Sequence, residues 1–143
     1  MAWITPTEVN LAAYMAQDEI DAYRRLMGFD PTNGQSKDPV EIVLEDTAVM
    51  VRGYCHVQLD EDNPFSIPRS LLSSAMAIAR FRLLTRMQLD IQEDRRTDYE
   101  QAMHHLALVA SGEVLVEPPS GEEQDGSRVV PLWGLSFRPN ILR

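Results

Sequence analysis

The sequence from Ile67 to Gly112, IPRSLLSSAMAIARFRLLTRMQLDIQEDRRTDYEQAMHHLALVASG, decides the fold. Apolar residues recur in each half of this stretch at the spacing that places them on one side of an α-helix. They are Leu72, Met76, Ala79 and Leu83 in the first half, and Tyr99, Ala102, Met103, Leu106, Val109 and Ala110 in the second. Two such helices, joined by a short connection, bury their apolar sides by folding back as an antiparallel hairpin. The sequence therefore predicts an all-α protein: a small helical bundle built on this central hairpin, with an extended C-terminal tail.

The ends of the hairpin carry residues that start and stop helices. Pro68 suits the first helical position, where a missing N–H group costs nothing. The second helix is expected from Asp98 to Ala110, and Gly112 suits the left-handed residue that ends a helix. Four arginines lie on the first helix, Arg69, Arg80, Arg82 and Arg86, and we expect them to pair with acids of the N-terminal half rather than to form a nucleic-acid surface.

Three further helices are expected before the hairpin. Thr5, Pro6 and Glu8 form a capping box, with Ile4 and Val9 as a hydrophobic staple, at the start of a helix that holds Val9, Ala12, Ala13 and Tyr14. A second helix runs from Asp18 to Met27, with acids first, arginines last and Gly28 as its stop. Asp38 and Pro39 begin the third helix.

The third helix has apolar residues on two sides. One side carries Val40, Val43, Leu44, Thr47, Val51, Tyr54 and Cys55, and the other carries Ile42 and Val49. Two apolar sides indicate two neighbours, either two parts of this domain or this domain and another subunit. Ile42 and Val49, with the i, i+4 pair Arg82 and Arg86, are therefore a candidate subunit interface. Gly53 is unfavourable within a helix and predicts close backbone packing or fraying there.

Charge and composition divide the chain further. The chain has 143 residues and a net charge of −9. Residues 1–66 contain 12 acids and 4 bases, and residues 67–112 contain 5 acids and 6 bases. Residues 113–126 contain 5 acids and no base, and residues 127–143 contain 3 bases and no acid. An acidic chain binds nucleic acid poorly, because affinity for phosphates depends on clustered Lys and Arg. Its single cysteine, Cys55, and the lack of a signal peptide or long apolar run predict a soluble protein from a reducing compartment, without a membrane partner.

The C-terminal part predicts a docking segment. We expect a helical domain over residues 1–117, a flexible acidic linker over 118–127 and a docking tail over 128–143. The predicted partner-binding residues are Leu132, Trp133, Leu135, Phe137, Arg138, Ile141, Leu142 and Arg143. Trp and Arg are enriched among the residues that dominate binding energy. The alternative is that this tail folds back on its own domain.

No pattern in the sequence assembles an active site. His104 and His105 are adjacent on a helix, so their side chains diverge and cannot share a metal ion as an i, i+4 pair can. The run from Asp60 to Asp62 lacks the spacing of a calcium loop. There is no Gly-x-Ser-x-Gly turn and no phosphate-binding glycine loop. We therefore expect no enzyme activity, no metal and no cofactor.

Several short motifs follow one another in a fixed order. They are MAWIT at 1–5, a helix like that from Val40 to Tyr54, RSLL at 69–72 after Pro68, AIARFRLL at 77–84, DYEQAM at 98–103 and ASG at 110–112. This order resembles the Mu-like prophage family of small head–tail connector proteins. The match spans residues 1 to about 117. The segment after Tyr54 and the long tail after Pro119 depart from the family pattern.

The resemblance implies a structural neck protein without catalytic activity, located in the virion at the head–tail interface and in the host cytoplasm during assembly. It would form a ring under the portal, a dodecamer by analogy with the family, and would bind the portal protein and a tail-side neck or stopper protein. DNA would pass through the lumen without specific binding. A separate hypothesis, from the charge distribution, is that the acidic surplus of the N-terminal half, with Asp18, Glu19 and Asp21, faces the lumen and repels DNA. The alternative from another class is a dimeric helical regulator or antitoxin-like binding module; a third is an enzyme of unknown type.

Overall fold

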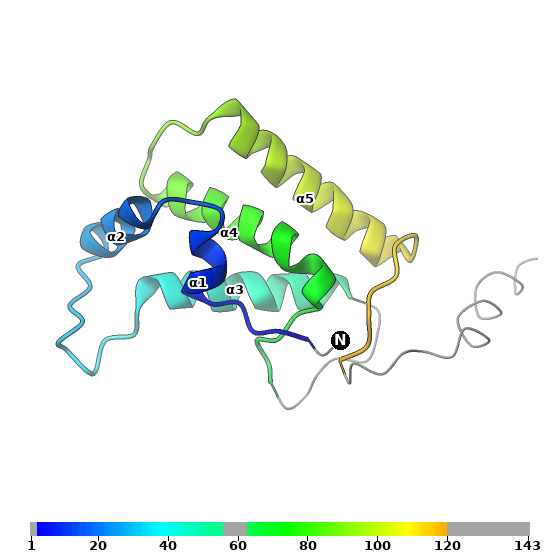
Figure 1. Cartoon of the computed structure of the whole chain (residues 1–143), viewed down its shortest axis with the longest axis horizontal. Coiled ribbons are helices and arrows are strands. Elements are labelled where there is room, and N and C mark those ends of the chain that lie inside the picture. The colour runs from blue at the N-terminus through cyan, green and yellow to red at the C-terminus, as the bar shows by residue number, and fades with distance from the viewer. Residues whose placement is uncertain (1–2, 56–62, 120–143) are drawn as a thin grey trace, which may run out of the picture.

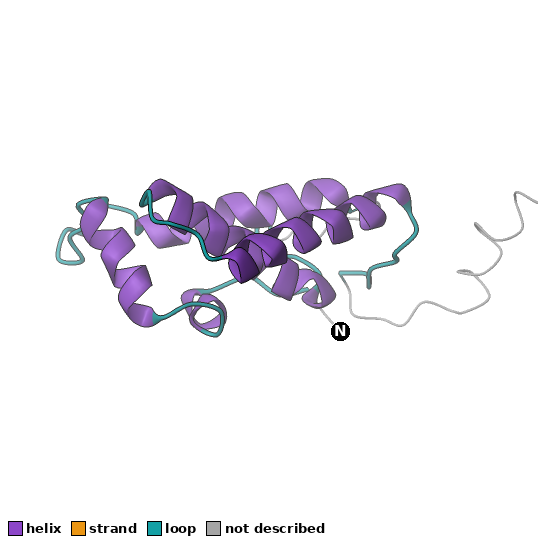
Figure 2. Ribbon diagram, turned by 90° about the horizontal axis from the view of Figure 1, so that it is seen from above, coloured by secondary structure: helices purple, strands orange, loops and turns teal. Residues whose placement is uncertain are grey.

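Helix α4 lies at the centre of a helical bundle in the computed structural model, which describes residues 3–55 and 63–119 (Figure 1). The helices are α1 (Glu8–Ala12), α2 (Gln17–Leu26), α3 (Pro39–Tyr54), α4 (Leu72–Arg86) and α5 (Glu93–Ser111), with a short 3-10 turn, η1 (Arg69–Leu71), directly before α4. Within the described residues the only extended pairing is a single antiparallel bridge between Ile4 and Ile67. The prediction of an all-α fold is confirmed (Figure 2).

Helices α4 and α5 form the predicted antiparallel hairpin and pack along their lengths (Figures 1 and 2). α4 is buried over more of its surface than its predicted stripe, because α1 and α3 cover the side that faces away from α5. Its buried residues are Ala75, Met76, Ala77, Ile78, Ala79, Arg80, Leu83 and Leu84, whereas Leu72 is half-buried. The alanines let neighbouring helices approach α4 closely. α4 is therefore a central helix rather than an amphipathic surface helix.

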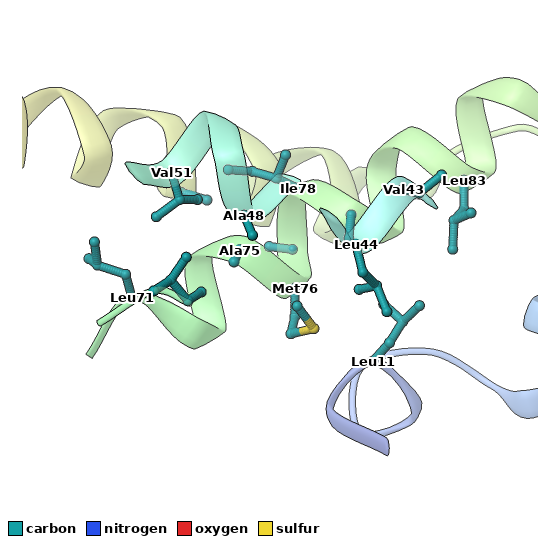
Figure 3. Packing of buried hydrophobic residues seen from close by; sticks show 14 of the residues in the cluster. Leu11, Val43, Leu44, Ala48, Val51, Leu71, Ala75, Met76, Ile78 and Leu83 are labelled. Carbon is teal, nitrogen blue, oxygen red and sulfur yellow. The ribbon is translucent and has the colours of Figure 1, made fainter. Parts of the chain in front are cut away.

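The core is continuous from α1 to α5. Figure 3 shows Leu11 of α1 reaching toward Leu44 of α3, and Ala48 of α3 beside Ala75 of α4. Leu106 of α5 is fully buried in the same cluster. Each buried Leu or Ile contributes roughly 1.5–3 kcal/mol relative to an exposed one. Packing of apolar side chains against α4 therefore holds the bundle together.

The first helix begins later than the sequence predicts. Thr7, not Thr5, precedes α1, and its backbone N–H donates to Asn10 Oδ1 at 2.9 Å. Leu11 is the buried residue of this short helix. Val9 is 80% exposed and forms no staple. The helix ends at Ala12, and the expected extension to Tyr14 is therefore wrong.

Other helix ends were predicted with mixed success. Asp38 caps α3 by accepting from the Val40 N–H, and Gly112 ends α5 with φ +87°, as expected. Pro68 precedes the 3-10 turn instead of occupying the first helical position. α5 begins at Glu93, five residues before the predicted start. Nothing lies within 4 Å of a Cβ position at Gly53, so close backbone packing, one of the two alternatives expected there, is wrong, and α3 ends one residue later at Tyr54.

The two ends of the described chain are fastened to one another. The Trp3 indole Nε1–H donates to the Glu117 carbonyl oxygen at 2.8 Å. The Glu117 carboxylate accepts from the Ser70 hydroxyl at 2.5 Å and from its backbone N–H at 3.2 Å. Burial opposes ionisation of Glu117, but these hydrogen bonds prevail and the pKa of its carboxyl is lowered. The chain therefore leaves the described domain beside the N-terminal end of α4.

Candidate interaction surface

A groove opens on the outside of the bundle where α3, α4 and α5 meet. Its volume is about 270 Å³. It is lined by Val43 and Asp46 of α3, Phe81, Arg82, Thr85 and Arg86 of α4, and Tyr99 of α5. We call it the arginine groove, because two guanidinium groups lie in its wall. It combines an apolar wall with groups that bind anions.

Two aromatic rings stack in the arginine groove. The ring centroids of Phe81 and Tyr99 are 3.9 Å apart and their planes are 14° apart. Both side chains are half-buried. Stacking of this kind contributes about 0.5–1.5 kcal/mol beyond the area buried. The pair holds α5 to α4 and presents an aromatic surface to an occupant of the groove.

The two arginines of the groove lack a carboxylate partner within the described residues. Arg82 Nη2–H donates to the Met50 thioether sulfur at 3.0 Å, which is a weak acceptor. No carboxylate oxygen of the described chain lies within 4.0 Å of Arg82 or Arg86, even though Asp46 lines the same groove. A guanidinium group binds carboxylates strongly through paired N–H donors. This capacity is available to a partner.

Exposed apolar side chains border the arginine groove. Ile42 is 40% exposed and Val49 is 53% exposed. Around the axis of α3 both lie within about 60° of Asp46, on the side away from the core. Of the predicted subunit interface, Arg82 and Arg86 line the groove, and Ile42 and Val49 lie on the same outer side of α3 as its lining residue Asp46. Contact with another subunit through them stays a prediction.

Two arginines elsewhere in the bundle, Arg24 and Arg95, are engaged in ion pairs with carboxylates. Arg24 on α2 contacts Glu8 at 2.5 Å and Asp38 at 2.6 Å, and thereby joins the N-terminal helices to the start of α3. Arg95 at the start of α5 binds Glu19 on α2 through two hydrogen bonds. Hydrogen bonds from Arg24 and Arg95 lower the pKa of Glu8 and of Glu19, respectively. These pairs are part of the scaffold and are not open to partners.

The expectation that the hairpin arginines pair with acids of the N-terminal half is wrong: within the described residues none of Arg69, Arg80, Arg82 and Arg86 forms such a pair. Arg80 pairs instead with Asp98 on α5, at 2.9 Å. Its Nη1–H donates to the Tyr14 carbonyl oxygen, and its Nε–H, which is buried, has no partner within the described residues. Arg80 lies one helical turn after buried Met76, and this position was the signal in the sequence that it would be buried.

A second cavity, of about 450 Å³, lies beside Arg80. Its polar lining includes Ser73, Ser74, Asp98, Gln101 and His105. Arg80 lines this cavity, but it is paired there with Asp98, which lines the same cavity. The arginine groove, whose guanidinium groups lack a carboxylate, is therefore the stronger candidate for binding a partner.

The described residues contain no group of three or more His, Cys, Asp or Glu that could hold a metal ion. Of the two adjacent histidines, His104 is exposed and His105 is half-buried.

Burial raises the pKa of the Cys55 thiol to about 11, so Cys55 is an unreactive thiol at neutral pH. No helix of the described chain is long and apolar enough to span a bilayer. The acidic run from Asp60 to Asp62 lies outside the described residues.

The predicted docking residues also lie outside the described part of the chain. They are Leu132, Trp133, Leu135, Phe137, Arg138, Ile141, Leu142 and Arg143. Within the described part, sequence reasoning missed Asp46, Phe81 and Tyr99 as groove residues. The positions of Phe81 and Asp46 beside apolar residues of their helices gave no sign that the two would share a cavity.

One comparison with known proteins gives a match. The family model described as Bacteriophage Mu, Gp36 matches residues 6–130, which include every described helix. Neither a curated protein nor a solved structure matches the chain.

Proposed function

Because this chain belongs to the Bacteriophage Mu, Gp36 family, we propose that it is a head–tail connector protein of the virion neck. The family makes it a phage protein, and the match over residues 6–130 is the observation that carries the proposal. In this role the chain forms a ring under the portal and joins the capsid to the tail. It acts as a structural adaptor and catalyses no reaction.

Ring formation requires two different surfaces on each subunit. A cyclic ring uses heterologous contacts, in which one patch meets a different patch on the next copy. The arginine groove with Ile42 and Val49 beside it supports one of these surfaces, because it offers exposed apolar area and two arginines without carboxylate partners. The C-terminal tail, residues 128–143, supplies the contact with the portal.

The charge of the chain suits a channel through which DNA passes. The net charge is −9, so an unpaired acidic surface repels DNA instead of holding it. Asp18 is exposed and can contribute to such a surface. Glu19 cannot contribute fully, because Arg95 neutralises it, and Asp21 lies 3.6 Å from Arg24. Replacement of Asp18 alone tests the charge of the lumen without disturbing an ion pair.

A protein inventory of purified virions tests the proposal. The chain should be present in a fixed low copy number, and particles that lack it should have heads without joined tails. Absence from virions, together with a stable dimer in solution, would instead support the regulatory or antitoxin-like alternative.

Portal binding has its own test. The full chain with Trp133→Ala and Phe137→Ala should keep its helical circular dichroism spectrum and lose affinity for purified portal. The matched control is Val9→Ala, which shortens an 80% exposed apolar side chain on α1. Unchanged portal affinity of the tail variant would refute the docking role.

A further inference from the structure

The arginine groove is locally basic on a chain that is strongly acidic. Arg82 and Arg86 face one carboxylate, Asp46, whereas the whole chain has a net charge of −9. The groove has a volume of about 270 Å³, which suits a few side chains of a short segment rather than a whole folded element. An acidic segment meets both conditions.

The chain itself contains such a segment. Residues 120–127 read SGEEQDGS, with three carboxylates among small and polar residues and no base. The basic tail that follows, residues 128–143, carries three arginines and no acid, and Arg82 and Arg86 would repel it. Of the two C-terminal segments, charge therefore selects Glu122, Glu123 and Asp125 for the groove.

The position of the chain exit favours a groove on another copy. Glu117 is bound to Ser70, at the N-terminal end of α4, and Figure 1 shows the last described residues at that end. Arg82 and Arg86 lie roughly 18 and 24 Å further along α4. Glu122 and Glu123 are at most about 10–14 Å beyond residue 119, even in a fully extended chain. Within one copy Glu122 and Glu123 therefore fall short of both arginines, and Asp125, at most about 20–22 Å beyond residue 119, approaches Arg82 only if the chain runs almost straight along α4. A neighbouring copy does not impose this constraint.

We propose that residues 122–125 of one copy bind in the arginine groove of the next copy, where Glu122, Glu123 and Asp125 pair with Arg82 and Arg86. The stacked rings of Phe81 and Tyr99 pack against the backbone of the segment. This contact links subunits head to tail and directs residues 128–143 away from the groove. The proposal rests on the proposed function, in which the chain forms a ring.

A charge exchange between two variants of the full chain tests this contact. One variant carries Arg82→Glu and Arg86→Glu, and the other carries Glu122→Arg, Glu123→Arg and Asp125→Arg. Self-association is measured by sedimentation velocity and native mass spectrometry, on the chain alone and on purified portal. Each variant by itself should associate at least about tenfold more weakly than the wild type. An equimolar mixture should recover association, with the two variants alternating.

Two controls accompany the exchange. Arg96→Glu on α5 reverses an exposed arginine outside the groove and should leave association unchanged. Circular dichroism verifies folding, and Arg82→Gln with Arg86→Gln is the milder variant if charge reversal unfolds the chain. Association should also weaken as salt is raised, because exposed ion pairs are screened.

The possible results separate the contact from its rivals. Recovery in a single chain that carries all five substitutions, without recovery in the mixture, would show an intramolecular contact and overturn the proposal. So would wild-type association in both variants, or a wild-type chain that is monomeric alone and on the portal. Absence of the chain from virions would defeat the neck role but would leave this measurement of self-association unaffected.

Discussion

Arg24 ties three helices together, and its replacement by methionine should destabilise the bundle strongly. Its Nη1–H and Nη2–H groups donate to the two oxygens of Glu8, at 2.9 and 2.5 Å. Its Nε–H and Nη2–H groups donate to the two oxygens of Asp38, at 3.1 and 2.6 Å. Arg24→Met keeps an apolar stem of similar length on α2 and leaves both carboxylates without their cation.

The size of the effect follows from these contacts. A hydrogen bond to a charged group contributes about 1.5–3 kcal/mol, and several bonds of one guanidinium do not add fully. The side chains of Arg24, Glu8 and Asp38 are 20%, 35% and 23% exposed, so solvent screens part of the interaction. We expect the free energy of unfolding to fall by about 3 kcal/mol near neutral pH.

This loss should depend on pH with a definite sign. Arg24 lowers the pKa of Glu8 below its ordinary value of 4.5 in the folded chain. A carboxyl whose pKa is lowered by folding stabilises the fold above its unfolded pKa, and that stabilisation disappears as the pH falls through the folded pKa. The difference between wild type and Arg24→Met should therefore be largest near neutral pH and shrink below about pH 4.5.

Urea unfolding followed by circular dichroism, at about pH 7 and about pH 3, measures both effects. Arg25→Met is the matched control, because Arg25 is the next residue of α2 and its side chain is exposed. Its effect should stay within about 0.5 kcal/mol at both pH values. An equal loss for the two variants, or a loss for Arg24→Met that is the same at both pH values, would refute the role of the ion pairs.

Three further predictions concern single side chains. Leu106→Ala should cost about 2–5 kcal/mol in urea unfolding because it opens a cavity beside α4, whereas Leu89→Ala, at a 51% exposed site, should cost less than about 0.5 kcal/mol. Gly112→Ala should lower the melting temperature in calorimetry by roughly 3–5 °C, because φ is +87° and the strain is about 1 kcal/mol; an unchanged temperature would contradict this. Cys55 has a pKa of about 11, so iodoacetamide should modify it about ten- to a hundredfold more slowly in the folded chain than in urea; equal rates would show an exposed thiol.

Local signals in the sequence predicted most of the long helices. Asp38, followed by Pro39, starts α3 by accepting a backbone hydrogen bond. Gly112 ends α5 by adopting a left-handed conformation. Both signals involve only a few neighbouring residues, so they can be recognised in the sequence. The antiparallel hairpin followed from two apolar stripes with a short connection. The predicted start of α1 was wrong because Thr5 and Thr7 can both precede a helix. In the structure α1 follows Thr7 and buries Leu11.

The candidate surface was only partly predictable, because it depends on which helices meet. Ile42 and Val49 could be assigned to the outer side of α3 from their spacing alone. That Val43 and Asp46 of α3 share a groove with Arg82 and Arg86 depends on the packing of α3 against α4, which no local pattern encodes. The same is true of the stack between Phe81 and Tyr99, which lie on different helices.

The hydrogen bond from Trp3 to the Glu117 carbonyl has a practical consequence for purification and reconstitution. An affinity tag fused ahead of Trp3 would sit beside the point where the chain leaves toward its C-terminal segment, and could crowd that segment in a binding assay. Removal of the first three residues would also remove this hydrogen bond to Glu117. A cleavable tag, taken off before portal binding is measured, keeps the hydrogen bond in place.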